Sequence, residues 1–332
     1  MKRLIKFDKF VAGIILVIVL AYFLPGLASR QSSVPLDTIA KVGISLIFFF
    51  YGLKLNPDKI RQGLRNWRLH LLAQSFVFLV FPLIVLAFYP LFKSGTYFDI
   101  WLAFLFMAAL PSTVSSSVVM VSIAKGNIPA AIFNASISGL IGILVTPLWM
   151  GIFLEHQSTE FSFITVYTDL VLQILLPVVI GLLFHRYLGN FASRYSGYLT
   201  LFDKSVILLI IYKSFVHSFE DGIFETVALP QLAMIYLAVL AIFFLVYALI
   251  GGVAKSMKFS IEDRITAQFC GTKKSLVHGT VFANILFPAS FSIGIILLPL
   301  MLFHVTQIFI ISIIASKYSK REIDIDTVKT YS

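Results

Sequence analysis

Apolar residues fill long stretches of the chain, and most polar residues fall in the short segments between these stretches. Ten apolar segments are each long enough to cross a hydrocarbon core of ~30 Å as a helix. They cover residues 10–28, 36–54, 69–92, 98–124, 128–154, 161–187, 200–219, 229–254, 262–287 and 290–316. The pattern predicts an all-α polytopic membrane protein with ten transmembrane helices, here called spans one to ten in chain order.

Composition agrees with this prediction. Of the 332 residues, 59% are hydrophobic and 13% are charged, and the mean hydropathy is +0.94. Such values exclude a soluble globular protein of this length, so membrane lipid is the expected surrounding. The net charge of +10 comes from basic residues at the ends of the predicted spans. A nucleic-acid partner is therefore not needed to explain it.

The basic residues also predict the orientation of the chain. If the chain starts in the cytoplasm and crosses ten times, twenty of the 26 Lys and Arg residues lie on the cytoplasmic side, and only Arg30 and Lys93 lie outside. Positive charge gathers on the cytoplasmic side of membrane proteins. We therefore expect both termini in the cytoplasm, with residues 317–332 as a cytoplasmic tail.

Four lysines, namely Lys41, Lys213, Lys273 and Lys274, fall within spans. An ammonium group near the bilayer centre costs at least ~2.5 kcal/mol unless it faces water or a partner, so these residues call for a functional explanation. The sequence places no carboxylate at mid-span. Any coupling to sodium or protons must therefore use neutral oxygens or a titrating Lys or His. No cofactor is expected.

A weak internal repeat divides the chain into two halves. Residues 112–130 and 271–289 agree at six of nineteen positions when offset by 159 residues. These segments lie in spans four and nine, which gives halves 1–160 and 161–316 with five spans each. An odd number of spans forces the halves into opposite orientations, and inverted repeats of this kind are typical of secondary transporters.

The repeated segments also carry the signs of broken helices. Pro111 removes a backbone donor and is followed by four serines and one threonine within six residues, and Gly271 takes the corresponding place in span nine. An ordinary proline kink is the alternative. A break at mid-membrane starts a new helix, whose N-terminus favours an anionic group. The candidate binding residues here are Thr113, Ser115, Ser116, Ser117, Thr272, Lys273, Lys274 and Ser275.

Several stretches resemble one known family. They are Ala-Leu-Pro-Ser-Thr at 109–113, Ala-Lys-Gly-Asn at 124–127, residues 74–82 of span three, and Cys-Gly-Thr-Lys-Lys-Ser-Leu at 270–276. On these stretches the sequence resembles the bile acid/sodium symporter family, particularly its orphan bacterial branch related to the seventh vertebrate member. The resemblance implies a bacterial inner-membrane protein. It also implies a core of spans three to five and eight to ten, with spans four and nine broken and crossing, packed against a panel of spans one, two, six and seven.

The sodium site is where the sequence departs from that family. By motif spacing, the family's ion-binding Glu falls at or beside Phe269 or Cys270, and its Gln falls at or near Lys273. An ammonium in place of a cation ligand suggests that Lys273 or Lys274 stands in for the sodium ion. Oxygen ligands for a modified sodium site nevertheless remain in Ser116, Ser117 and Asn134. Gln74 joins the candidates for substrate or ion binding.

Two further candidates come from spacing and depth. Lys274 and His278 are four residues apart, so on a continuous helix they share a face and could form a proton-responsive pair. A His that is merely hydrogen-bonded is the plainer interpretation. Lys213 lies deep in span seven and is the best placed of the remaining lysines to face a cleft between core and panel.

The sequence thus predicts a secondary active transporter that moves a small organic anion or amphipath by alternating access, bile-acid-like by resemblance. It predicts no enzyme, because Ser275 adjoins Lys274 and points to a different face, and no zinc-protease motif is present. Two alternatives stay open. One is a sodium-coupled symporter with a Ser/Asn oxygen site, and the other is a non-transporting regulator of ion homeostasis acting through a partner protein. The oligomeric state is left open.

Overall fold

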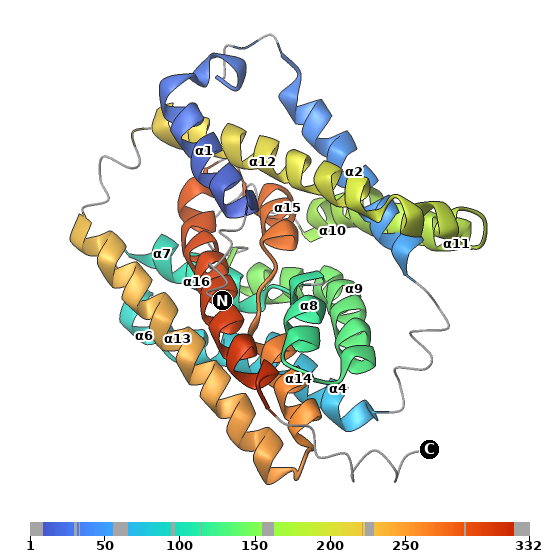
Figure 1. The fold of residues 1–332 in the computed structure, drawn as a ribbon. Helices are drawn as coiled ribbons and strands as arrows, with labels where there is room; N and C mark the ends of the chain where they lie inside the picture. The colour runs from blue at the N-terminus through green and yellow to red at the C-terminus, as the bar shows by residue number, and fades with distance from the viewer. Residues whose placement is uncertain are drawn as a thin grey trace.

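A computed structural model describes residues 9–29, 32, 34–55, 66–93, 97–113, 115–154, 163–220, 222, 229–288 and 290–321 (Figure 1). Within these ranges the regular secondary structure is entirely helical. The all-α prediction is therefore confirmed. The residues after 321, which include most of the predicted tail, lie outside the described part.

The helices of the first half occupy the first five predicted spans. They are α1 (Lys9–Phe23), α2 (Leu36–Lys54), α4 (Trp67–Ser75), the π-helical turn η3 (Phe76–Val80), α5 (Phe81–Leu86), α6 (Tyr89–Phe92), α7 (Phe98–Ala109), α8 (Ser115–Ile123) and α9 (Ile128–Leu154), with a short 3₁₀ turn η1 (Pro25–Leu27) after α1. Because α4, η3 and α5 follow one another without a gap, they form one continuous helical segment.

The helices of the second half occupy the remaining predicted spans. They are α10 (Phe163–Leu170), the π-helical turn η4 (Val171–Leu175), α11 (Leu176–Arg194), α12 (Ser196–Glu220), α13 (Leu229–Ser256), α14 (Ile261–Thr272), α15 (Leu276–Leu286) and α16 (Ile293–Ser319). Among the described residues, each predicted half contains one π-helical turn, in its third and first predicted span respectively.

Six described helical stretches are long and apolar enough to cross a membrane. They are Leu36–Lys54, Trp67–Leu86, Ile128–Leu154, Ile164–Arg194, Leu229–Ser256 and Ile293–Ser319. The four other predicted ranges hold shorter or more polar helices. Helix α1 has 15 residues, and α12 carries charged residues. The remaining two ranges hold the broken pairs α7/α8 and α14/α15. A multi-pass membrane protein is therefore confirmed, while length and composition identify six spans and not ten.

The predicted breaks in spans four and nine are present. Helix α7 ends at Ala109, and Leu110 is extended (φ −72°, ψ 151°), as expected of a residue whose neighbour Pro111 disfavours the helical region. Helix α14 ends at Thr272, where Lys273 is also extended (φ −77°, ψ 148°). Ser275 then caps α15 by accepting a hydrogen bond from the backbone N–H of His278.

The helices fall into two groups by their contacts. In the first group α1 packs against α12, and α2 packs against α11 and α12. In the second group α7 packs against α16 and α9, and α14 packs against α13, α4 and α9. Figure 1 shows the first group along the upper and right side of the view and the second group below it.

Helices α2 and α11 approach so closely that their backbones touch. A Cβ atom on Gly52 would stand 2.2 Å from the carbonyl oxygen of Val178, and one on Gly181 would stand 2.1 Å from that of Phe49. No larger residue fits at either position. Small residues allow this kind of contact between helices in membranes, where van der Waals packing drives association.

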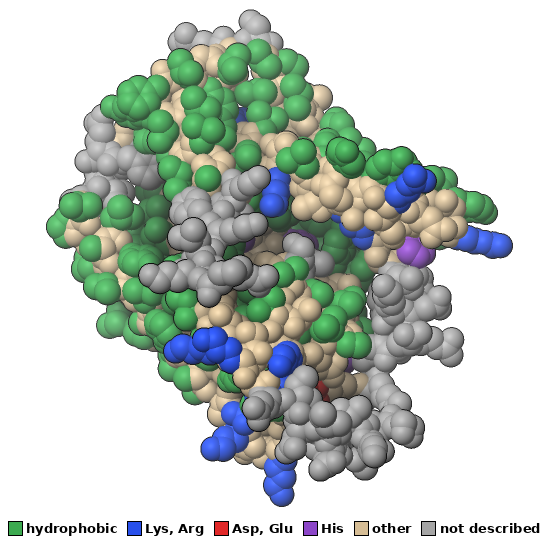
Figure 2. Space-filling view, in the orientation of Figure 1, with side chains coloured by type: hydrophobic (Ala, Val, Ile, Leu, Met, Phe, Trp, Pro, Cys, Tyr) green, Lys and Arg blue, Asp and Glu red, His purple; other side chains and the backbone are tan. Residues whose placement is uncertain are grey.

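Hydrophobic side chains cover much of the surface. Figure 2 shows them over the upper and left parts of the view, whereas Lys and Arg side chains gather at the lower end and at the right-hand tip. Large exposed apolar residues lie on α1, α11 and α13, for example Phe23, Leu183 and Leu237. Such a surface is suited to lipid.

Candidate functional site

The interrupted segments of the two halves meet, and we call residues 110–113 and 270–275 the helix crossing. The backbone N–H of Ser275 donates to the carbonyl oxygen of Pro111 at 2.9 Å. The hydroxyl of Ser112 donates to the carbonyl oxygen of Cys270 at 2.6 Å. Each break therefore supplies hydrogen-bond partners for backbone groups that the other has released, which makes an irregular backbone tolerable at membrane depth.

Main-chain oxygens enclose the ammonium group of Lys274. Its Nζ donates to the carbonyl oxygens of Val77 (2.7 Å), Ala108 (2.6 Å) and Leu110 (3.0 Å). The last two carbonyls lie at the C-terminal end of α7, where helical partners run out, and Val77 lies in the π-helical turn η3. An ammonium has three N–H donors, so these carbonyls saturate it. The face of the Phe81 ring, 4.3 Å away, adds a cation–π contact.

A side chain from α16 fixes the backbone at Lys274. The Gln307 side-chain amide accepts from the backbone N–H of Lys274 and donates to its carbonyl oxygen, both at 2.8 Å. Gln307 is fully buried and also contacts Nδ1 of His304 at 3.0 Å. The sequence analysis did not single it out, although a lone Gln in the middle of span ten was a usable signal. Gln307 replaces the helical partners that the extended backbone of this segment lacks.

Lys273 points to the other side of the crossing, toward the start of α8. Its Nζ donates to the carbonyl oxygen of Ser116 at 2.9 Å and lies 3.4 Å from the Ser116 hydroxyl. That hydroxyl donates to the hydroxyl of Thr113, which also bonds to the Ser117 hydroxyl, each at 2.8 Å. Lys273 is fully buried. Ser116, Ser117 and Thr113 thus form a hydroxyl cluster, which contacts Lys273 through Ser116.

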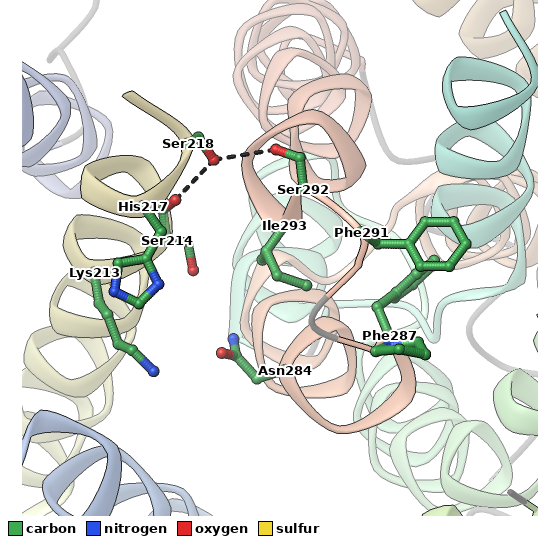
Figure 3. A pocket seen from close by; sticks show the side chains of 10 residues that line it. Lys213, Ser214, His217, Ser218, Asn284, Phe287, Phe291, Ser292 and Ile293 are labelled. Carbon is green, nitrogen blue, oxygen red and sulfur yellow. Dashed lines mark hydrogen bonds between the residues drawn. The ribbon is translucent and has the colours of Figure 1, made fainter. Parts of the chain in front are cut away.

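A cavity of about 550 Å³ is lined by α12 on one side and by α15, the start of α16 and the residues between them on the other. We call it the α12 cavity. Its polar lining residues are Lys213, Ser214, His217, Ser218, Asn284 and Ser292, and its apolar ones are Phe287, Pro288, Phe291 and Ile293. Figure 3 shows Lys213 and His217 on one wall and Asn284 facing them from the other. Neither Lys273 nor Lys274 lines it.

Lys213 is the cationic residue of this cavity, as its predicted position facing a cleft suggested. Its ammonium forms an ion pair with Asp37 at the start of α2, and the Asp37 side chain is 73% exposed. The structure therefore separates the predicted site residues into two places. The helix crossing holds Lys273 and Lys274, and the α12 cavity holds Lys213.

Comparison with known families decides the identity of the chain, because residues 8–320 match one of them. The chain belongs to the SBF-like CPA transporter family. The resemblance to the bile acid/sodium symporters is thereby confirmed. As a member of a transporter family, the protein is a non-enzymatic transporter, as the sequence predicted.

Curated relatives of this SBF-like transporter match it over nearly their whole length. It is 37% identical over 319 residues to "Uncharacterized protein PA2026" of Pseudomonas aeruginosa, with 96% of this chain and 94% of the relative covered. It is 34% identical over 323 residues to "Putative symporter YfeH" of Escherichia coli (95% and 93% covered). It is 29% identical over 324 residues to "Sodium/bile acid cotransporter 7" of Danio rerio (93% of each covered).

Two of the other predicted oxygen ligands, Gln74 and Asn134, bond to each other. The Gln74 side chain donates to the carbonyl oxygen and to Oδ1 of Asn134, at 3.2 and 3.1 Å, and Asn134 donates to Ala130. Among the residues described, Oε1 of Gln74 and Oγ1 of Thr272 are buried without a hydrogen-bond partner. Ser115 begins α8, and its side chain lies outside the described part.

Lys274 and His278 do not share a helix face, and the hydrogen bond that His278 makes agrees with the plainer interpretation of this residue. Lys274 lies outside α15, between the extended residues Lys273 and Ser275, so the spacing of four residues does not place the two side chains on one helix face. His278 instead contacts the Ser275 hydroxyl through Nδ1 at 2.9 Å. Its ring packs against Phe48 and Tyr51 of α2, with ring centroids 5.6 and 6.1 Å apart. His278 therefore belongs to the contact between α15 and α2.

Proposed function

We propose that this SBF-like transporter carries a small organic anion by alternating access, with the ammonium of Lys274 in the place where related carriers hold a mobile sodium ion. The observation that carries the proposal is the set of three carbonyl oxygens within 3.0 Å of Nζ. Unwound backbone and half-helix C-termini are the groups that coordinate sodium in secondary transporters. Here a lysine side chain reaches such a set.

Electrostatics argues against a second cation at the same place. Two unit charges 4 Å apart repel by ~4 kcal/mol at an effective dielectric of 20. The Ser116 and Ser117 hydroxyls, which belong to the proposed sodium site, both already bond to the Thr113 hydroxyl. The Lys273 ammonium donates a hydrogen bond to the carbonyl oxygen of Ser116. A sodium ion bound there would lie next to a fixed positive charge. We therefore propose transport without sodium coupling.

The packing supports two inverted five-helix repeats, residues 1–160 and 161–316, and ten crossings. The first span (α1) packs on the seventh (α12) and the second (α2) on the sixth (α11). Likewise the fourth (α7) packs on the tenth (α16) and the fifth (α9) on the ninth (α14). Each of these contacts between the two halves has a counterpart in which the equivalent spans have exchanged halves. Such an exchange is what a pseudo-two-fold axis in the membrane plane produces.

The same contacts support a panel of spans one, two, six and seven that moves against a core of spans three to five and eight to ten. The α12 cavity lies at their boundary, because α12 belongs to the panel and α15 and α16 belong to the core. With both termini in the cytoplasm, as the basic residues predict, this cavity lies in the outer half of the membrane. We propose a bacterial inner-membrane location, with the tail 317–332 in the cytoplasm.

A flux measurement tests this function. The full chain is reconstituted into liposomes, and uptake of radiolabelled organic anions is measured with choline, potassium or sodium as the only external cation. We expect saturable uptake of at least one anion, equal in all three media. Absence of uptake for every anion, combined with specific capture of a partner membrane protein, would favour the regulator instead.

The sodium-coupled symporter remains a second candidate because of one observation. The buried oxygens of Gln74 and Thr272 have no partner among the described residues. Unpartnered buried oxygens are costly and are suited to a cation or an ordered water. In the flux measurement, this candidate predicts uptake that requires sodium and rises with its concentration.

A further inference from the structure

The α12 cavity allows the chemical class of the cargo to be inferred from its walls. We propose that it takes a compact, hydroxyl-rich organic monoanion such as a sugar acid, with Lys213 binding the anionic group. This inference rests on the proposed function, because it treats the cavity as a substrate site. It narrows that function, since six of the ten lining side chains are polar, whereas a steroid-like amphipath calls for a mainly apolar lining.

Six of the ten lining side chains are polar, and they include all four that α12 contributes. Ser214, His217 and Ser218 follow Lys213 along one face of α12, and Asn284 and Ser292 come from the opposite side. In Figure 3 the Lys213 amine, the His217 ring and the Asn284 amide point into the space between the two walls. Polar groups within membrane helices are tolerated where they face water or a polar ligand.

The polar groups retain hydrogen-bonding capacity for a ligand. The Ser218 hydroxyl donates to the carbonyl oxygen of Ser214 at 2.8 Å and lies 3.2 Å from the Ser292 hydroxyl, and the Asn284 amide nitrogen donates to Thr280 at 2.9 Å. Each hydroxyl keeps an acceptor site, and the Asn284 carbonyl oxygen accepts from a ligand hydroxyl. Several neutral acceptors beside one ammonium are complementary to a molecule with several hydroxyls and one charge.

The sign of the charge follows from two features. Among the described residues that line the cavity, Lys213 is the single Lys or Arg, and none is Asp or Glu. Helix α16 begins directly after Ser292 and runs for 27 residues, so its positive N-terminal end faces the same space. Both features favour an anion.

The aromatic residues of the lining do not offer a slot for a steroid. The Phe287 ring packs against Phe106 and Phe291, with centroids 5.2 and 5.6 Å apart, and Phe287 is buried. Figure 3 shows the Phe287 and Phe291 rings turned away from α12. Sites for apolar ligands are lined mainly by apolar side chains. The molecule has an apolar groove of about 330 Å³ between α2 and α12, but its lining contains no cation.

Asp37 acts as a competitor for the ligand at Lys213. Its carboxylate pairs with Lys213 and is otherwise largely exposed to solvent at the start of α2. An incoming carboxylate must displace it or share the ammonium with it. Removing the charge of Asp37 is therefore expected to strengthen anion binding, whereas removing the charge of Lys213 is expected to abolish it.

Uptake into liposomes holding the full chain tests the inference, with radiolabelled D-glucuronate, taurocholate and myo-inositol as probes. We expect saturable uptake of glucuronate and none of the neutral inositol. Lys213→Gln should lower glucuronate uptake at least tenfold, and Asp37→Asn should lower its half-saturating concentration a few fold. Lys41→Gln, which alters an exposed lysine of α2 outside the cavity lining, is the matched control and should behave as the parent.

Three results would overturn the inference. If taurocholate is carried and glucuronate is not, the cargo class is wrong while the proposed transport function stands. If neither these probes nor any other anion is carried, the inferred cargo class and the proposed transport function are both wrong. If glucuronate is carried equally well by the parent and by Lys213→Gln, the α12 cavity is not its binding site.

Discussion

Lys274 and Lys213 are both lysines within predicted apolar spans, yet one is enclosed by protein and the other lines a cavity. Lys274 is fully buried with three carbonyl partners, and its backbone is held by Gln307. Lys213 has one carboxylate partner, which is itself largely exposed. The saturated ammonium has no donor left for a ligand, so it serves as a fixed charge. The cavity lysine can exchange its partner for a ligand.

The comparison predicts its largest effect at Lys274. Lys274→Met keeps the length of the side chain but removes the charge and all three donors, which leaves buried carbonyls unsatisfied. We expect a loss of stability of at least about 3 kcal/mol. Cys270, the single cysteine, is buried within the helix crossing, so a thiol-reactive fluorophore reports unfolding on heating. Lys41→Met, at an exposed lysine, is the control. Equal melting curves for Lys274→Met and Lys41→Met would contradict a structural role for the buried Lys274.

A smaller effect is expected at Gln307. Gln307→Leu removes two hydrogen bonds to the backbone of Lys274 and leaves a buried N–H and C=O without partners. We expect a loss of about 2 kcal/mol, measured by the same thiol labelling. Lys41→Met, at an exposed lysine of α2, serves again as the control. An unchanged melting curve would show that the extended segment does not depend on α16.

The smallest effect on stability is expected at Lys213. Lys213→Gln breaks one ion pair whose carboxylate is mostly exposed, and such pairs contribute about 1 kcal/mol or less. The melting curve should therefore nearly match that of the parent even though anion transport is lost. A large loss of stability would place Lys213 with Lys274 as a structural charge.

The sequence identified the two lysine environments only in part. The helical ranges and both breaks follow from apolar length, Pro111 and the polar run at 271–275, because these are properties of residue type. The position of Lys213 facing a cavity followed from its depth in span seven. A shared helix face for Lys274 and His278 required a continuous helix, whereas the chain is extended at Lys273.

The partners of Lys274 were not predictable from residue types. Its three acceptors are main-chain carbonyls, which every residue carries, so no residue at 77, 108 or 110 has a side chain that marks the site. Only the meeting of α7 with the π-helical turn η3 brings these oxygens together. Tertiary packing therefore defines this site, and the sequence supplies only the cation.

The most direct test of the central claim is the effect of sodium on thermal stability. Melting of the parent and of Lys274→Ala is followed by Cys270 labelling in sodium chloride or choline chloride at equal ionic strength. We predict that the parent melts at the same temperature in both salts. The variant, whose carbonyl oxygens are freed, should be stabilised by sodium in a saturable manner. A saturable stabilisation of the parent by sodium would contradict the claim that Lys274 replaces the ion.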